Sequence, residues 1–203
     1  LHHAIGSVDT SGDTLTLDGG TGFVNVMGNI GTTPTNKLTG FTVINAAQVD
    51  LANVEVTEGD IAVTGTNIVL NSTAYTTTTS GSITFTGPVD LDAGAVTTSI
   101  TTAGGETDSV TITGATNDTS AGQTSLTINS GDGDTSVKAI GTGTAVDALS
   151  ISSSGTITLN GSINTDNNVG TGNVTIAGAG TTSLAADVVI NTDAANDGSG
   201  GAV

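Results

Sequence analysis

Short runs that alternate apolar and polar residues recur along the chain, and they constrain its fold more than any other feature. Each run places apolar side chains on one face of a strand and Thr, Asp, Asn or Glu on the other. Gly, Asn, Asp and Ser, which favour turns, fill the intervals. The helical spacing i, i+3, i+4, i+7 is sustained nowhere, so we expect an all-β fold without substantial helix. The runs are Leu15–Leu17, Val24–Val26, Val49–Leu51, Val54–Val56, Ile61–Val63, Ile83–Phe85, Val89–Leu91, Val110–Ile112, Leu126–Ile128, Leu149–Ile151, Ile157–Leu159 and Val174–Ile176.

The composition first suggests disorder, because only 35% of the residues are hydrophobic and the net charge is -17. Disordered chains, however, are rich in Pro, Glu, Lys and Gln. This chain has two prolines, Pro34 and Pro88, and only three glutamates. Its Thr, Val and Ile residues suit half-buried strands instead. The sequence therefore favours a folded β-protein.

The strands are short, closely spaced and almost free of aromatic residues, which make up 2% of the chain. A β-sandwich core would normally contain larger aromatic side chains. Stacked coils of short strands need only small inward residues such as Val, Ile, Leu and Ala. We therefore predict a parallel β-helix, or β-solenoid, and retain a tandem of β-sandwich modules as the alternative.

The chain partly matches itself at an offset of about 110 residues, between segments 15–91 and 126–203. Phe41–Val43 matches Leu149–Ile151, for example, and Val49–Leu51 matches Ile157–Leu159. The gaps drift by a few residues, as stacked rungs allow. We interpret residues 1–203 as one continuous solenoid segment, although a globular domain duplicated once could give the same offset.

Three runs carry a resemblance to a known family: Leu15–Gly22, Gly81–Leu91 and Gly155–Gly161. They resemble the β-strand repeats of large filamentous-haemagglutinin-like bacterial adhesins. The resemblance implies a right-handed parallel β-helix within a long secreted cell-surface protein, as an internal shaft without chemistry. The Asn-Pro-Asn-Gly-type secretion motif of that family is not found. We expect an excerpt of a longer extracellular chain.

Charge and residue usage exclude several functions. With two lysines and no arginine, the chain lacks the cations that bind nucleic acid or anionic lipid. It has no cysteine, and its only histidines are the neighbours His2 and His3. No stretch approaches the ~18 apolar residues of a membrane helix. We therefore expect no enzyme, no catalytic or cofactor-binding residue, no nucleic-acid partner and no membrane insertion.

Three oxygen-rich stretches raise the question of calcium: Asp132–Asp134, Asn164–Asn168 and Asp193–Gly198. None has the closing glutamate of an EF-hand or the nonapeptide of a calcium-binding β-roll. Solvated turns are the favoured interpretation, so we predict no metal site. Calcium would act diffusely, by screening the acidic surface.

The remaining motifs also have simple interpretations. Gly19–Gly22 and Gly170–Gly172 are read as turns, because no Walker lysine or helix follows them. Lys37 and Lys138 are expected to be solvated. Glycosylation sequons at four asparagines are attributed to chance. Those asparagines are Asn71, Asn117, Asn160 and Asn173.

Threonines alternate on several strands, as an ice-binding surface requires. The pairs are Thr14 with Thr16, Thr84 with Thr86, Thr111 with Thr113, and Thr156 with Thr158. Outward positions also include Asp50, Glu55 and Asp90, so no uniform threonine array is expected.

These observations favour a non-catalytic structural and adhesive shaft. Its expected partners are neighbouring segments or identical copies, with glycans on a host or cell surface left open. Besides the β-sandwich array, a carbohydrate-binding or carbohydrate-cleaving β-helix is a further alternative. Such a site would need carboxylates beside Arg or aromatic platforms, yet the chain has no Arg and one tyrosine, Tyr75.

Overall fold

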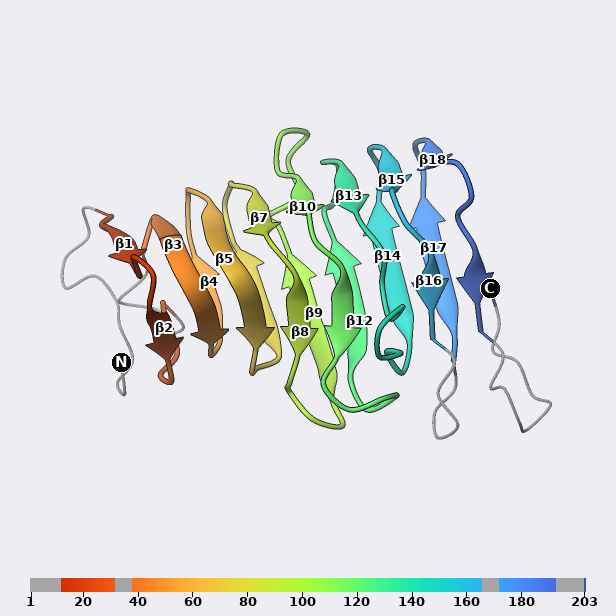
Figure 1. Cartoon of the computed structure of the whole chain (residues 1–203). Coiled ribbons are helices and arrows are strands. Elements are labelled where there is room, and N and C mark those ends of the chain that lie inside the picture. Colours follow the sequence, from red (N-terminus) through yellow and green to blue (C-terminus); the bar gives the residue numbers. More distant parts are fainter. Residues whose placement is uncertain (1–11, 32–37, 166–171, 193–202) are drawn as a thin grey trace.

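The chain winds into a parallel β-solenoid of about seven turns (Figure 1). This computed structural model describes residues 12–31, 38–165, 172–192 and 203. Every strand pair in the described part is parallel, and no helix occurs there. The predicted all-β solenoid is therefore confirmed. The described residues contain no helical segment suited to crossing a bilayer.

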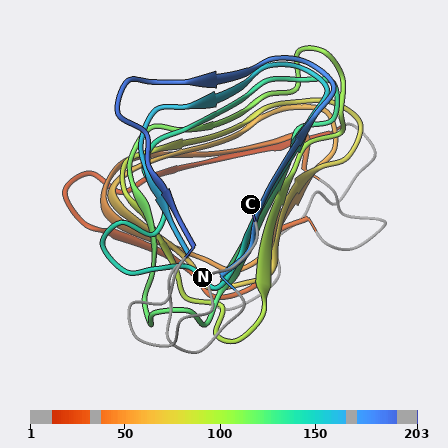
Figure 2. The same cartoon turned by 90° about the vertical axis from the view of Figure 1, so that its right-hand side faces the viewer.

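Viewed along the axis, the coil has a triangular outline with three sheet faces (Figure 2). The first face contains β1 (Thr14–Asp18), the start of β3 (Gly40–Leu51), the start of β5 (Ile61–Leu70), β7 (Ile83–Thr86), β10 (Val110–Ile112), β13 (Thr135–Val137), β15 (Ile157–Leu159) and β18 (Thr182–Leu184). The second face contains β2 (Phe23–Val26), the ends of β3 and β5, β8 (Val89–Leu91), β11 (Thr116–Asp118), β16 (Ile163–Asn164) and β19 (Ile190–Asn191). The third face contains β4 (Val54–Val56), β6 (Ala74–Thr77), β9 (Thr97–Thr101), β12 (Ser125–Asn129), β14 (Leu149–Ser153) and β17 (Val174–Gly178).

The structural repeat is the single turn, and its length varies. Phe41 lies beside Ile61, so one turn takes 20 residues, whereas Ile83 lies beside Val110, so another takes 27. The extra residues lie in loops at the corners, where they do not disturb strand pairing. Residues matched at the 110-residue offset lie on different faces, as Leu15 in β1 and Leu126 in β12 show.

Inward side chains of successive turns stack into columns and form one hydrophobic core. Away from the ends these side chains are almost completely buried, and burying each one contributes about 1.5–3 kcal/mol. Two columns of the first face are Leu15–Phe41–Ile61–Ile83–Val110–Thr135–Ile157–Thr182 and Leu17–Val43–Val63–Phe85–Ile112–Val137–Leu159–Leu184. The tandem β-sandwich alternative was wrong, because it required antiparallel sheets and two cores.

Buried hydroxyl groups line the corner where the third face leads into the next turn. The Ser130 hydroxyl donates to the carbonyl of Gly133 at 2.8 Å, and the Ser153 hydroxyl donates to the same carbonyl at 2.7 Å. Thr77 donates in the same way to Gly81 at 2.9 Å. These bonds satisfy carbonyls where the backbone leaves the ladder, which lets the chain turn inside a buried environment.

Glycines form the corner between the first and second faces. Gly87 has a φ of 132°, and a Cβ there would lie 2.0 Å from the carbonyl oxygen of Gly65. A Cβ on Gly114 would lie 2.3 Å from the carbonyl carbon of Gly87. Successive backbones approach so closely at this corner that no side chain fits.

We expect Gly87→Ala to lower the free energy of unfolding by at least about 3 kcal/mol, because an unfavourable φ is combined with backbone overlap. Gly94→Ala is the matched control, since Gly94 also has a positive φ of 77° but open space around its Cβ position. Its cost should be about 1–2 kcal/mol. Urea unfolding of both variants measures the difference, and equal midpoints would contradict the crowded corner.

Candidate functional site

The first face presents a regular array of outward hydroxyl groups. One column carries a hydroxyl at every turn except Ala62, and it contains no charged residue. Thr84 and Thr111 are half-buried neighbours in this column. A second, shorter column pairs Thr64 with Thr86. Next to it, the Thr113 hydroxyl accepts a hydrogen bond from the Gly87 amide at 3.2 Å. The first column is Thr16–Thr42–Ala62–Thr84–Thr111–Ser136–Thr158–Ser183.

The acidic residues expected to interrupt the threonines lie on other faces. Asp50 and Asp90 belong to the second face, and Glu55 belongs to the third. The sequence could not separate them because alternation shows only that a residue points outward, not from which face. On the first face the register brings Thr84 beside Thr111, but Ala62, Ser136 and Ser183 share that column and Gly40 lies beside Thr14, so the outward residues form a mixed hydroxyl column and not a uniform threonine array.

The second face carries amides and carboxylates. Asn191 donates from Nδ2 to Oδ1 of Asn164 at 3.3 Å, so amides of successive turns bond along the axis. The whole outward column is Asn25–Asp50–Val69–Asp90–Asn117–Gly141–Asn164–Asn191.

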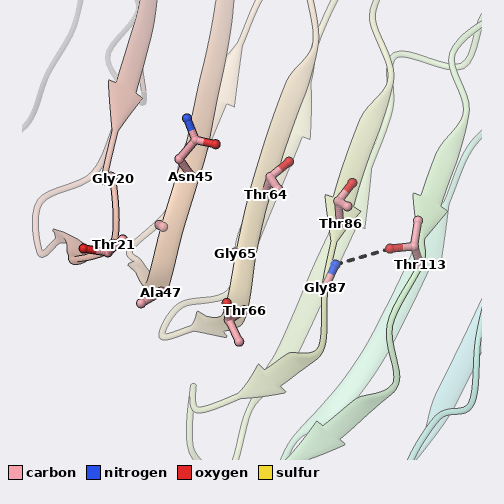
Figure 3. Close-up of a pocket in the computed structure, with 11 residues that line it drawn as sticks. Gly20, Thr21, Asn45, Ala47, Thr64, Gly65, Thr66, Thr86, Gly87 and Thr113 are labelled. Atoms are coloured by element: carbon pink, nitrogen blue, oxygen red, sulfur yellow. Dashed lines mark hydrogen bonds between the residues drawn. The ribbon is translucent and has the colours of Figure 1, made fainter.

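A groove of about 670 Å³ runs along the corner between the first and second faces (Figure 3). Thr64, Thr86 and Thr113 line it, with Gly65 and Gly87 beside them. It is hollow because the corner glycines have no side chains. No carboxylate and no aromatic ring lines it, so it lacks the groups that cleave or stack on sugars.

A smaller groove of about 390 Å³ lies near the β2 end, on the second face. Its lining includes one carboxylate, Asp50, together with Asn25, Asn29 and Asn71. The Asp50 carboxylate already accepts a hydrogen bond from Gln48 at 2.6 Å. A glycosidase needs two facing carboxylates, and only one is present in this lining.

Tyr75 is a core residue rather than a sugar platform. Its hydroxyl donates to the Leu51 carbonyl at 2.8 Å, and its ring meets Phe85 edge to face at 6.2 Å. Burial raises the pKa of the phenol well above its usual value. The side chain therefore contributes to the fold and offers nothing to a ligand.

In the oxygen-rich stretches, the described residues mainly form hydrogen bonds within the protein. The Asp134 carboxylate accepts a hydrogen bond from the Thr156 amide of the next turn at 2.6 Å. Asn164 takes part in the amide pair above, and the buried Thr165 hydroxyl donates to Gly172. In the described part of the chain, no three His, Cys, Asp or Glu residues gather as metal ligands. Residues 166–168 and the stretch Asp193–Gly198 lie outside the described residues.

Two buried aspartates were missed by the sequence interpretation. Asp118, 2% exposed, accepts hydrogen bonds from the amides of Ser120, Gln123 and Thr124. Asp108 accepts bonds from the amides of Gly81 and Gly105, at 3.0 and 2.9 Å. Both carboxylates hold loops in place. The one signal that could have indicated this role is an aspartate beside a Ser- or Gly-containing loop: Asp118 precedes Ser120 and Gly122, and Asp108 follows Gly104 and Gly105.

The remaining predicted residues are turn and surface groups. Gly20 has a φ of 56°, and its amide donates to Asp18, so this glycine run forms a turn. Lys138 is exposed on the first face. Lys37, His2 and His3 lie outside the described residues, as do Gly170 and Thr171.

The four sequon asparagines differ in their surroundings. Asn71 and Asn173 are exposed. Asn117 accepts a hydrogen bond from the Gly143 amide at 2.8 Å, and Asn160 donates to the Ser136 hydroxyl at 3.1 Å. The side chains of Asn117 and Asn160 are thus engaged in contacts between turns.

Comparison of the chain with protein-family models, with curated proteins and with solved structures finds no match in any of the three.

We expect Asp118→Ala to lower the free energy of unfolding by about 1–3 kcal/mol, because it leaves buried amides without an acceptor. Asp132→Ala is the control, since that side chain is exposed, and it should change stability by less than about 0.5 kcal/mol. Thermal and urea unfolding distinguish them. Equal losses in both variants would show that the Asp118 contacts do not stabilise the loop.

Proposed function

We propose that the chain is a non-catalytic structural shaft within an extracellular cell-surface protein of the filamentous-haemagglutinin-like adhesin kind. The observation that supports this most directly is the single uninterrupted stack, in which β1 and β19 occupy opposite ends (Figure 1). At ~4.8 Å per turn, about seven turns extend the molecule by about 34 Å. Each added turn would increase reach without requiring a new core.

The surface chemistry supports the same proposal. The buried Asp108 and Asp118, and the exposed Asp134, bind backbone amides of the protein itself. Neither groove has paired carboxylates, and the single tyrosine is inside the core. A carbohydrate-cleaving β-helix therefore finds no support in the described residues.

Net charge gives the shaft its solubility. A charge of -17 disfavours close contact between copies at low ionic strength, and salt weakens that repulsion. Calcium would likewise weaken this repulsion by diffuse screening of the surface charge.

If the chain is a shaft, it should hold two attached groups at a fixed distance without itself binding a surface. To test this, the chain is inserted between a surface anchor and a fluorescent tip on a displaying cell, with a flexible Gly-Ser linker of equal residue number as control. We expect a fixed separation of about 34 Å for the solenoid and a broad distribution for the linker. The same cells, probed on glycan-coated surfaces, should bind at background. Saturable binding by the chain alone would make it an adhesive module and contradict the shaft proposal.

We expect calcium to act only through ionic strength. Melting temperatures in CaCl₂ should equal those in NaCl at matched ionic strength, since the Asp134 carboxylate is engaged by the next turn. Asp132→Ala again serves as control. A rise specific to calcium that this variant abolishes would establish a cation site at Asp132–Asp134.

The first face favours a second candidate function, an ice-binding surface that orders water. Its hydroxyls repeat at ~4.8 Å between turns and ~6.6 Å along each strand. Thr84 lies beside Thr111, and Thr64 lies beside Thr86, so threonines of neighbouring turns are paired in both columns. Each threonine adds a methyl group beside its hydroxyl, which gives the face an apolar as well as a hydrogen-bonding character.

Freezing-point hysteresis tests this second function. The native chain should show hysteresis, and Thr111→Lys should abolish it because a charge interrupts the central column. Val69→Lys is the control, since it places the same charge on the second face. Absence of hysteresis in the native chain, or equal loss in both variants, would rule out the water-ordering face.

A further inference from the structure

The chain contains one Asn-Gly pair, Asn160-Gly161, and the fold places it at the glycine corner between the first and second faces. Asparagine followed by glycine is the pair that deamidates fastest in an unfolded chain, because no Cβ hinders the backbone nitrogen that attacks the side chain. Asn160 directly follows β15, and it is exposed. A chemically unstable pair therefore lies where water reaches it.

Deamidation joins two neighbouring groups of the chain and needs only water. The backbone nitrogen of Gly161 bonds to Cγ of Asn160, the Cγ–Nδ2 bond breaks, and ammonia leaves with the amide proton. Water then opens the five-membered succinimide ring at one of its two carbonyls. Opening at Cγ gives aspartate. Opening at the main-chain carbonyl gives isoaspartate, in which the main chain runs through Cγ, and neither step transfers an electron.

Hydrogen bonds to the preceding turn hold the Asn160 side chain away from this reaction. Nδ2 of Asn160 donates to the Ser136 hydroxyl at 3.1 Å, and the backbone amide of Asn160 donates to the Val137 carbonyl at 2.8 Å. Both acceptors belong to β13, which pairs with β15. The attack instead requires Cγ to turn towards the next residue of its own chain, so the bond to Ser136 must break first.

The Gly161 backbone has little room to move. A Cβ on Gly161 would lie 2.5 Å from the backbone nitrogen of Ala139 and 2.8 Å from its Cα. The following residue is also held, because the Ile140 amide donates to the Ser162 carbonyl at 2.9 Å. The peptide between Asn160 and Gly161 therefore swings towards Cγ only when this corner opens locally.

We propose that Asn160-Gly161 is a modification site whose deamidation is controlled by the fold, through the Ser136 hydrogen bond and the close approach of Ala139. The reaction proceeds when the corner opens and is suppressed while the corner is closed. The folded chain then converts only through the fraction of molecules that are open at this corner. The rate of conversion thereby records how often one corner of the coil opens.

The two products differ in their effect on the coil. Aspartate leaves the main chain unchanged and adds one negative charge beside Ser136, so the turn can close again. Isoaspartate lengthens the main chain by one carbon at a place where even a Cβ on Gly161 does not fit. The isoaspartate form therefore keeps this corner open, and the loss of ammonia makes the change irreversible.

Peptide-level mass spectrometry of the native chain tests the proposal. The folded chain, the chain unfolded in urea and a synthetic peptide of residues 156–164 are incubated at the same mildly alkaline pH. Conversion is measured as the mass gained when the Asn160 amide becomes an acid. We expect the peptide and the unfolded chain to convert at similar rates, and the folded chain at least about tenfold more slowly. Equal rates in the folded and unfolded chain would overturn control by the fold.

Ser136→Ala tests the hydrogen bond to the side chain. It should raise the rate in the folded chain about two- to tenfold without changing the rate in urea, because one restraint is lost. Thr111→Ala is the matched control, since Thr111 lies beside Ser136 in the same outward column. Circular dichroism first establishes that both variants fold. A rise confined to Ser136→Ala supports the restraint, whereas no rise, or equal rises in both variants, overturns it.

Asn160→Gln identifies the reacting residue. Glutamine keeps the amide but moves it one carbon farther from the backbone, where ring closure on the next nitrogen is slow. The mass gain of the unfolded chain should therefore fall sharply in this variant. An unchanged mass gain would place the conversion at another asparagine and contradict the proposal.

The isoaspartate form, purified after conversion and refolded, tests the effect on the corner. Its reference is Asn160→Asp, which contains the other product of the same reaction. We expect the isoaspartate form to unfold at a lower urea concentration than Asn160→Asp. Equal midpoints would show that the corner accommodates the longer main chain, and would contradict its crowding against Ala139.

Discussion

The parallel backbone ladder between successive turns is the interaction on which the rest of the structure depends. It fixes which residue lies above which, so columns made mainly of Ile, Leu and Val fill the interior, with Phe41, Tyr75 and Phe85 as the aromatic residues of the described core. The ladder stops at the corners of the coil. There, buried hydroxyls such as Ser130 and carboxylates such as Asp118 form hydrogen bonds with the backbone groups instead.

The same ladder explains what could be predicted from the sequence. Alternation of Ile61, Ala62 and Val63 identifies a strand, because burial follows a period of two in any sheet. Small inward residues and few aromatics then identify a stack rather than a sandwich. The bend inside β3 and β5 was not predictable from alternation, since Thr64-Gly65-Thr66 reads as a turn between two strands but continues as one.

The surface was harder to predict than the core. A period of two distinguishes inward from outward side chains, but it does not show to which of the three faces an outward side chain belongs. Only the register separates Thr111, on an uncharged hydroxyl column, from Asp90, on the acidic second face. The roles of Asp108 and Asp118 were likewise hidden, because their acceptor contacts come from loops whose shape is set by the turns around them.

The unequal length of the turns has a consequence for display. A corner can hold a short loop or a long one while the strands on either side keep their partners, as the turns of 20 and 27 residues show. A peptide grafted at one corner would leave every column in place. Two grafts on neighbouring turns would then be held about 4.8 Å apart along the axis, which makes the coil a ruler for presenting short sequences at fixed intervals.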